Sequence, residues 1–190
     1  MTVRASALLL AVLALPAQAE IFDVNVGSEA FRVAVNGPLS RLLSNVNGQY
    51  DFGTVVRPEN DEDLFTAFGG ALVTGDAGAR GIDVAAGLGA RLQYTGRERD
   101  SGGGVALGGQ LEARIPQYER VGFQTYAYFQ PEVISLGDVE EQKEFAANVD
   151  YQVLRDGSIY LGYRVLKVDI ENLGEVTADD GLHFGLRLKF

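Results

Sequence analysis

The chain of 190 residues contains no Cys and no Trp, and His183 is its one histidine. Without cysteine an exported chain has no disulfide framework, so a continuous hydrogen-bonded sheet has to stabilise it. Basic residues are also scarce, because 16 Lys and Arg stand against 26 Asp and Glu, for a net charge of −10. This acidic balance repels phosphate backbones and excludes nucleic acid as a partner.

No apolar run long enough for a transmembrane helix follows the first 19 residues. Residues 1–19 have the pattern of a secretory signal peptide, with Arg4 at the start, an apolar centre and the cleavage site Ala17-Gln18-Ala19. Their apolar run is shorter than the about 20 residues that a membrane anchor needs. We therefore predict an exported chain with a single domain, residues 20–190.

Alternation of apolar with polar or small residues is the main pattern that the chain does contain. Two stretches, 82–94 and 105–115, alternate with the period of a strand that has one apolar face. Each reaches the about 9–11 residues of a tilted membrane strand, whereas soluble strands average about 5–6. The last stretch, Gly181–Phe190, places Leu and Phe on one face and basic residues on the other. This pattern is typical of outer-membrane barrels, and Phe190 resembles their C-terminal assembly signal.

The first strands are expected to form a hairpin around Gly27-Ser28, with Val26 opposite Glu29 and Val24 opposite Phe31. A single long strand with a bulge is the alternative. Residues 39–43 have the spacing of one helical turn, which plugs a barrel end or rests at the membrane surface.

Near the other end of the chain, residues 166–170 shift the phase of the penultimate strand, which predicts a bulge there. Residues 172–180 are polar and are expected to form a loop before the last strand.

The connections alternate in length along the chain. Short turns are expected at Gly37, Gly75, Pro116 and Arg155, and longer loops at Arg57, Gly96, Pro131 and Asn172. Bacterial barrels have short periplasmic turns, long outer loops and an even number of strands. We therefore predict an all-β fold, an antiparallel transmembrane β-barrel of about ten strands, or eight if the first hairpin does not span. Its place would be the outer membrane of a Gram-negative bacterium.

The order of these motifs resembles the YfaZ family of small bacterial outer-membrane proteins. The resemblance is carried by Gly81–Tyr94, Gly102–Arg114, the segment from Leu161-Gly162-Tyr163-Arg164 to Glu171, and Gly181–Phe190. It implies an outer-membrane barrel and offers no catalytic residues to carry over.

The polar face of the strands predicts a lumen with charges of both signs. The candidate lumen charges are Asp83, Arg91, Glu112, Arg114, Asp150, Arg164, His183, Arg187 and Lys189. They form either a narrow pore for small solutes or a plug of paired groups, since unpaired buried charge is costly. The plug is favoured because open channels occur in barrels of about 16–18 strands. Inward Gly87, Gly89, Gly104 and Gly108 leave space, or make room for Tyr126, Tyr128 and Tyr160.

Catalysis and metal binding have little support in the sequence. A hydrolase or acyltransferase needs a base beside a nucleophile, and Ser158, near a turn, is the one candidate beside His183. A lumen histidine bonded to a carboxylate is the simpler interpretation. The acidic stretches 59–63 and Asp179-Asp180 lack the spacing of a calcium loop. We therefore expect no catalytic residue, cofactor or metal.

The function predicted from the sequence is that of a small non-enzymatic barrel, a structural or surface barrel or a narrow conduit for small solutes. The alternatives are a lipid-modifying enzyme that uses His183 and, with less support, a soluble periplasmic lipocalin-like binder. The expected partners are outer-membrane lipids and lipopolysaccharide, together with the barrel-assembly machinery and periplasmic chaperones. We expect a monomer.

Overall fold

The structure is a computed structural model. It describes residues 20–43, 46–58, 63–78, 81–97, 100–171 and 173–190. The expected signal peptide and most of the acidic stretch 59–63 lie outside the described residues.

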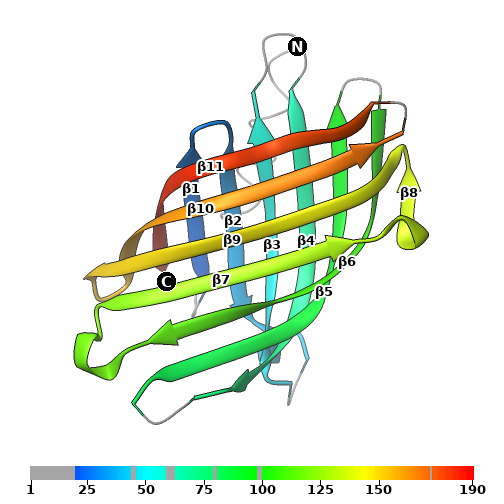
Figure 1. The fold of residues 1–190 in the computed structure, drawn as a ribbon. Coiled ribbons are helices and arrows are strands. Elements are labelled where there is room, and N and C mark those ends of the chain that lie inside the picture. Colours follow the sequence, from blue (N-terminus) through cyan, green and yellow to red (C-terminus); the bar gives the residue numbers. More distant parts are fainter. Residues whose placement is uncertain (1–19, 44–45, 59–62, 79–80, 98–99, 172) are drawn as a thin grey trace.

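Nearly all of the described chain is strand, with three short 3-10 turns (Figure 1). The strands are β1 (Ile21–Gly27), β2 (Phe31–Pro38), β3 (Gly48–Arg57), β4 (Leu64–Asp76), β5 (Asp83–Arg97), β6 (Asp100–Arg114), β7 (Val121–Gln130), β8 (Ser135–Gly137), β9 (Val139–Leu154), β10 (Gly157–Ile170) and β11 (Gly174–Lys189). The 3-10 turns are η2 (Leu39–Arg41), η3 (Pro116–Tyr118) and η4 (Glu132–Ile134).

Ten of these strands close into an antiparallel barrel, as the sequence predicted. Each strand pairs with its neighbours in the chain, and β1 closes the ring by pairing with β11 from Ile21–Lys189 to Gly27–His183. The short β8 pairs with β6 beyond the end of β7, so it extends the wall without adding a spanning strand. In Figure 1 the strands in front cross those behind at a steep angle, which is the tilt that closure requires.

The expected hairpin of β1 and β2 is confirmed, but its expected register was wrong. Val26 lies opposite Phe31 and Val24 opposite Val33. The amide of Gly27 donates to the carbonyl of Ala30 at 2.7 Å, so the two-residue turn is Ser28-Glu29. The apolar residues still share one face, because a shift of two residues keeps each side chain on its side.

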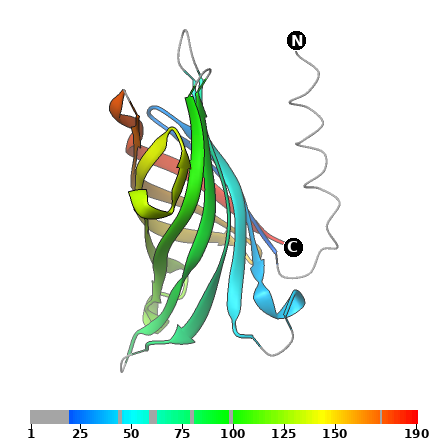
Figure 2. The ribbon, with the colours of Figure 1, turned by 90° about the vertical axis from the view of Figure 1, so that its right-hand side faces the viewer.

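The connections fall at two ends of the barrel, as Figure 2 shows from the side. One end holds Glu20, Phe190 and the turns after β2, β4, β6 and β9; we call it the Phe190 end. The other holds the turns after β1, β3, β5, β7 and β10; we call it the Ala30 end. The sequence predicted long loops after Gly96 and at 172–180. Both predictions were wrong, because most of these residues belong to strands β5, β6 and β11.

The single helical turn expected at 39–43 lies beside β3, and it does not plug the lumen. Leu39 is buried against Gly48, so an added side chain at position 48 would contact it. Leu42 and Leu43 remain exposed. The Tyr50 hydroxyl and the Arg41 guanidinium both donate to Oε1 of Glu20, at 2.7 and 2.8 Å. This cluster fixes the turn after β2 to the first described residue of the barrel.

The bulge expected near 166–170 lies on β11, and β10 keeps one phase throughout. Leu166 pairs with Asp179 and Lys167 with Thr177, which leaves Ala178 as the additional residue on β11. The apolar residues Leu166, Val168 and Ile170 are therefore buried on the inner face. The bulge changes which side of β11 faces inward, so a segment that resembles a polar loop continues the sheet.

Candidate functional site

The lumen is divided into three layers along the barrel. At the Ala30 end, apolar side chains from opposite walls meet in one buried cluster, which we call the apolar seal. Its members are Ala30, Ala34, Val55, Leu64, Phe68, Val139, Leu166, Val168, Ile170 and Ala178. Because β2–β4 and β9–β11 lie on opposite arcs of the ring, this cluster spans the lumen.

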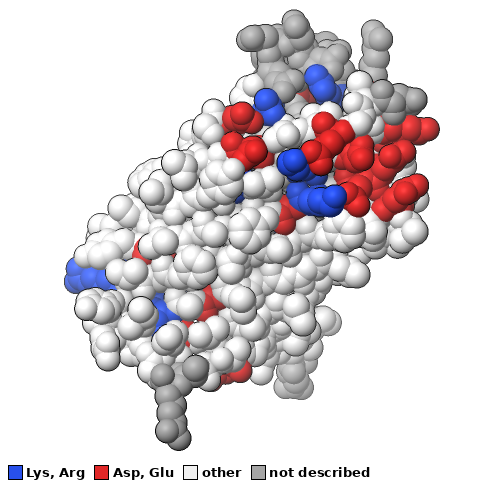
Figure 3. All heavy atoms as spheres, viewed as in Figure 1, with Lys and Arg blue, Asp and Glu red and all other residues white. Residues whose placement is uncertain are grey.

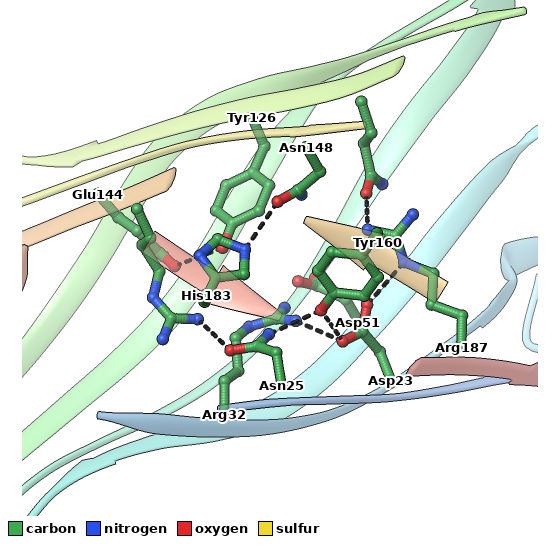
Figure 4. A network of polar contacts seen from close by, with 12 residues as sticks. Asp23, Asn25, Arg32, Asp51, Tyr126, Glu144, Asn148, Tyr160, His183 and Arg187 are labelled. Carbon is green, nitrogen blue, oxygen red and sulfur yellow. Dashed lines mark hydrogen bonds and ion pairs between the residues drawn. The ribbon is translucent and has the colours of Figure 1, made fainter. Parts of the chain in front are cut away.

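Below the seal, a network of ion pairs and hydrogen bonds converges on Asp23 (Figure 4). The Tyr160 hydroxyl donates to Oδ1 of Asp23 at 2.6 Å, and Nε of Arg187 donates to Oδ2 at 2.8 Å. The Arg32 guanidinium lies 3.7 Å from Oδ1. The Asn25 amide donates to the Tyr160 hydroxyl at 2.8 Å. Both oxygens of this buried carboxylate are therefore compensated, as a buried charge requires.

A second buried ion pair joins β10 to the bulged strand β11. Nε of Arg164 donates to Oδ2 of Asp179 at 2.6 Å, and both side chains are 0% exposed. Nη1 of Arg164 donates to Oδ1 of Asn25 at 3.0 Å. Arg164 therefore connects the first strand, the bulge and the layer directly beneath the apolar seal.

Arg91 crosses the other side of the lumen between two carboxylates. Its Nη2 lies 2.5 Å from Oδ2 of Asp51, and its Nη1 donates to Oε2 of Glu144 at 3.1 Å. The Tyr126 hydroxyl donates to the other oxygen of Glu144 at 3.0 Å. The guanidinium also stacks 3.6 Å from the ring centre of Tyr128, a favourable arrangement for a desolvated arginine.

His183 lies in the wall of this network and bonds to an amide. Its Nε2 lies 2.7 Å from Oδ1 of Asn148, and its ring meets the edge of Tyr160 at 5.7 Å between centres. The sequence predicted a carboxylate as the partner of this histidine, and that prediction was wrong. Because an amide oxygen only accepts hydrogen bonds, Nε2 carries the proton and acts as the donor. Gly162 makes room here, since a Cβ would lie 2.0 Å from Asn148 Oδ1.

The third layer is a cavity of about 730 Å³ that opens at the Phe190 end; we call it the vestibule. Nη2 of Arg114 lies 3.1 Å from Oδ2 of Asp150 in its wall, and the Gln124 amide donates to Glu112 at 3.1 Å. Network residues, among them Asp23, Arg32 and Arg187, line its inner part. The vestibule is therefore polar, open at one end and closed by the network at the other.

Eight of the nine candidate lumen charges line the vestibule, and Arg164 lies behind it. Asp83 and Lys189 are exposed at the mouth, whereas Arg91, Asp150 and His183 are buried. One expectation from the sequence was that inward glycines make room for tyrosines. Gly108 does so, because a Cβ at this position would lie 2.6 Å from the ring of Tyr128.

Five buried charges at the centre of the network were not among the sequence candidates. They are Asp23, Arg32, Asp51, Glu144 and Asp179. The first four lie on the polar face of alternating strands, so the alternation in the sequence could have identified them. Asp179 follows a bulge that no simple period reveals.

Among the described residues, no group of three or more His, Asp or Glu side chains could hold a metal ion. No helix in the described ranges is long and apolar enough to cross a membrane.

Comparison with known proteins gives one family. The family model described as YfaZ precursor matches residues 2–190. No curated protein matches the chain.

Proposed function

The chain belongs to the YfaZ family, and we propose that it is a closed, non-conducting barrel of the bacterial outer membrane. Its Phe190 end would face the periplasm and its Ala30 end the exterior. The single observation that carries the proposal is the apolar seal, which spans the lumen above a layer of buried ion pairs.

The outer wall supports a membrane location over a soluble binder. Leu88 is 76% exposed and Leu92 68% exposed on β5, and similar large apolar side chains surround the barrel. Figure 3 shows a wall largely free of charge, with charged groups gathered toward the two ends. A closed sheet pairs its backbone groups internally, which the hydrocarbon of a bilayer demands. An apolar surface of this extent in water would be an aggregation hazard.

Aromatic side chains mark two levels of the wall, as the interfacial girdles of membrane barrels do. Tyr118 and Tyr151 are exposed toward the Phe190 end, and Tyr94 and Phe129 toward the Ala30 end. Above the second level, strands β9–β11 carry exposed ion pairs such as Lys167–Glu175. These pairs suit water or lipid headgroups better than acyl chains.

The orientation follows from the export route. The expected signal peptide delivers the chain to the periplasm, and an even number of strands leaves Glu20 and Phe190 at one end. A chain that inserts hairpins from the periplasm keeps both of these residues on that side.

The seal argues against a conduit, because a narrow apolar constriction excludes water and with it ions. An ion would have to cross the seal and then displace Arg164 or Arg91 from carboxylates that they neutralise. Each such displacement exposes a buried charge without a partner, which costs several kcal/mol, on the order of 3–5.

Conductance in a planar bilayer tests the proposal. The refolded chain, shown to be inserted by its resistance to protease, should give no discrete current steps. Replacing seal residues by Leu166→Gly and Ile170→Gly should allow water to reach the ionic layer and produce leak currents. The matched control Leu161→Gly with Val165→Gly, on the outer side of β10, should stay silent. Regular current steps from the unmodified chain would overturn the proposal.

A further inference from the structure

The vestibule has a property that the closed-barrel proposal does not use: three uncompensated carboxylates line one arc of its wall, and the basic side chains without an ion pair to a described residue lie on another arc. Asp76, Asp83 and Glu112 line it from β4, β5 and β6. Within the described parts of the chain, none of these carboxylates forms an ion pair. Asp76 accepts a hydrogen bond from the amide of Gly78, and Glu112 accepts one from the Gln124 side chain. This arc of the wall is therefore negative.

The opposite arc carries the unpaired cations. Lys189 lies at the end of β11 and Arg155 in the turn between β9 and β10, and both line the cavity. Neither forms an ion pair with a described residue. In the ring order, β4–β6 and β9–β11 are separated by β7 on one side and β1–β3 on the other. These two cations thus face the carboxylates of β4–β6 across the opening, with Asp156 beside Arg155 in the same turn.

A metal ion does not fit this arrangement. The carboxylates come from three different strands, and no group among the described residues has the proximity that chelation needs. The lining does not fit a conduit either, because the inner end of the cavity is closed and a solute must leave where it entered. A charge-separated lining instead fits a solute with separated charges.

The size of the solute follows from the width of the barrel. Ten strands about 4.8 Å apart give a backbone circle about 15–20 Å across once the strands tilt. Inward side chains from both walls narrow that circle further. An extended peptide covers about 3.3–3.6 Å per residue, so a few residues are enough to cross it. The cavity volume of about 730 Å³ also lies in the range of small-molecule sites, about 300–1,000 Å³.

We propose that the vestibule binds a short zwitterionic solute of the size of a di- or tripeptide. Its ammonium group lies against Asp76, Asp83 and Glu112, and its carboxylate against Lys189 and Arg155. In the inner wall, Asp23, Tyr160 and Arg187 are already fixed by short hydrogen bonds, so binding does not have to order these three side chains.

The two ends of the solute are not held equally. The turns at the mouth also contain Glu119 and Asp156, so acidic groups outnumber basic ones around the cavity. The ammonium group therefore contributes more than the carboxylate, and blocking the amine should weaken binding more than blocking the acid. This inference goes beyond the closed-barrel proposal and does not depend on a membrane location.

Isothermal titration of the refolded chain in detergent micelles with trialanine tests it. Trialanine should bind, N-acetyl-trialanine should bind about fivefold or more weakly, and trialanine amide should lose less. Asp83→Asn with Glu112→Gln should weaken trialanine binding about tenfold, because the solute loses its ion pairs with one exposed and one half-buried carboxylate. Glu171→Gln, at the opposite end of the barrel, is the matched control and should leave binding unchanged.

Absence of trialanine binding to a protein whose circular dichroism shows the folded sheet would overturn the inference. So would equal affinity for the acetylated peptide, because the acidic arc would then have no role. Neither result bears on conductance, so failure of this inference and failure of the closed-barrel proposal are distinguishable.

Discussion

The ion pair between Arg164 and Asp179 gives the sharpest test of how the lumen is stabilised. Both side chains are 0% exposed, and Nε of Arg164 lies 2.6 Å from Oδ2 of Asp179. In Arg164→Met the apolar replacement fills the space of the arginine stem, but Asp179 becomes a buried carboxylate without its ion-pair partner. Asn25 also loses the donor that reaches its Oδ1 at 3.0 Å.

The expected loss of stability follows from these two changes. Removing one partner of a buried ion pair costs about 3–5 kcal/mol. The unsatisfied amide oxygen adds about 1 kcal/mol. We therefore expect Arg164→Met to lower the free energy of unfolding by about 4–6 kcal/mol. Asp179→Leu should lower the free energy of unfolding by about 3–5 kcal/mol, because Arg164 then becomes the buried charge without a partner.

The double variant Arg164→Met with Asp179→Leu should recover most of this loss, because apolar replacement of both partners is often close to neutral. Urea unfolding in lipid vesicles, followed by circular dichroism, measures all four proteins. A double variant as unstable as the sum of the two single variants would refute the reasoning. So would a cost below about 1 kcal/mol for Arg164→Met, the level of an exposed pair.

Two further predictions use the same unfolding measurement. Tyr160→Phe removes the hydroxyl that donates to Asp23 and accepts from Asn25, and it should cost about 1–3 kcal/mol; an unchanged midpoint would mean that water replaces the hydroxyl. Gly162→Ala should cost about 1–3 kcal/mol by overpacking against Asn148, whereas Gly75→Ala, which meets nothing within 4 Å, should be close to neutral. Equal effects of the two glycine replacements would contradict the packing described for the lumen.

The number and identity of the strands could be predicted from the sequence because alternation is a local property. The stretches 82–94 and 105–115 lie within β5 and β6 or extend one residue past them, and closure with ten strands agrees with the even number expected of a barrel. The start of β11 was missed, because the bulge at Ala178 exchanges the faces and gives 172–180 the appearance of a polar loop.

The layering of the lumen could not be predicted, because it depends on which residues share a height in the barrel. Asp23 and Tyr160 are 137 residues apart in the chain and meet only through the stagger of the closed sheet. Likewise, Leu166, Val168 and Ile170 become a seal only when they meet Phe68 and Val55 across the lumen. The alternation along a strand predicts which residues point into the lumen, but not which residues they meet on the opposite wall.

The absence of native cysteine makes one measurement especially direct, since single cysteines can be placed without background. Glu112→Cys lies in the vestibule, Val168→Cys in the apolar seal and Leu88→Cys on the outer wall. Each variant, reconstituted in vesicles, is exposed from either side to a charged maleimide that does not cross the bilayer. The closed barrel predicts that Glu112→Cys reacts from the Phe190 side, Leu88→Cys stays protected by lipid, and Val168→Cys reacts only after unfolding. Labelling of Val168→Cys in the folded protein at the rate of Glu112→Cys would contradict a sealed lumen.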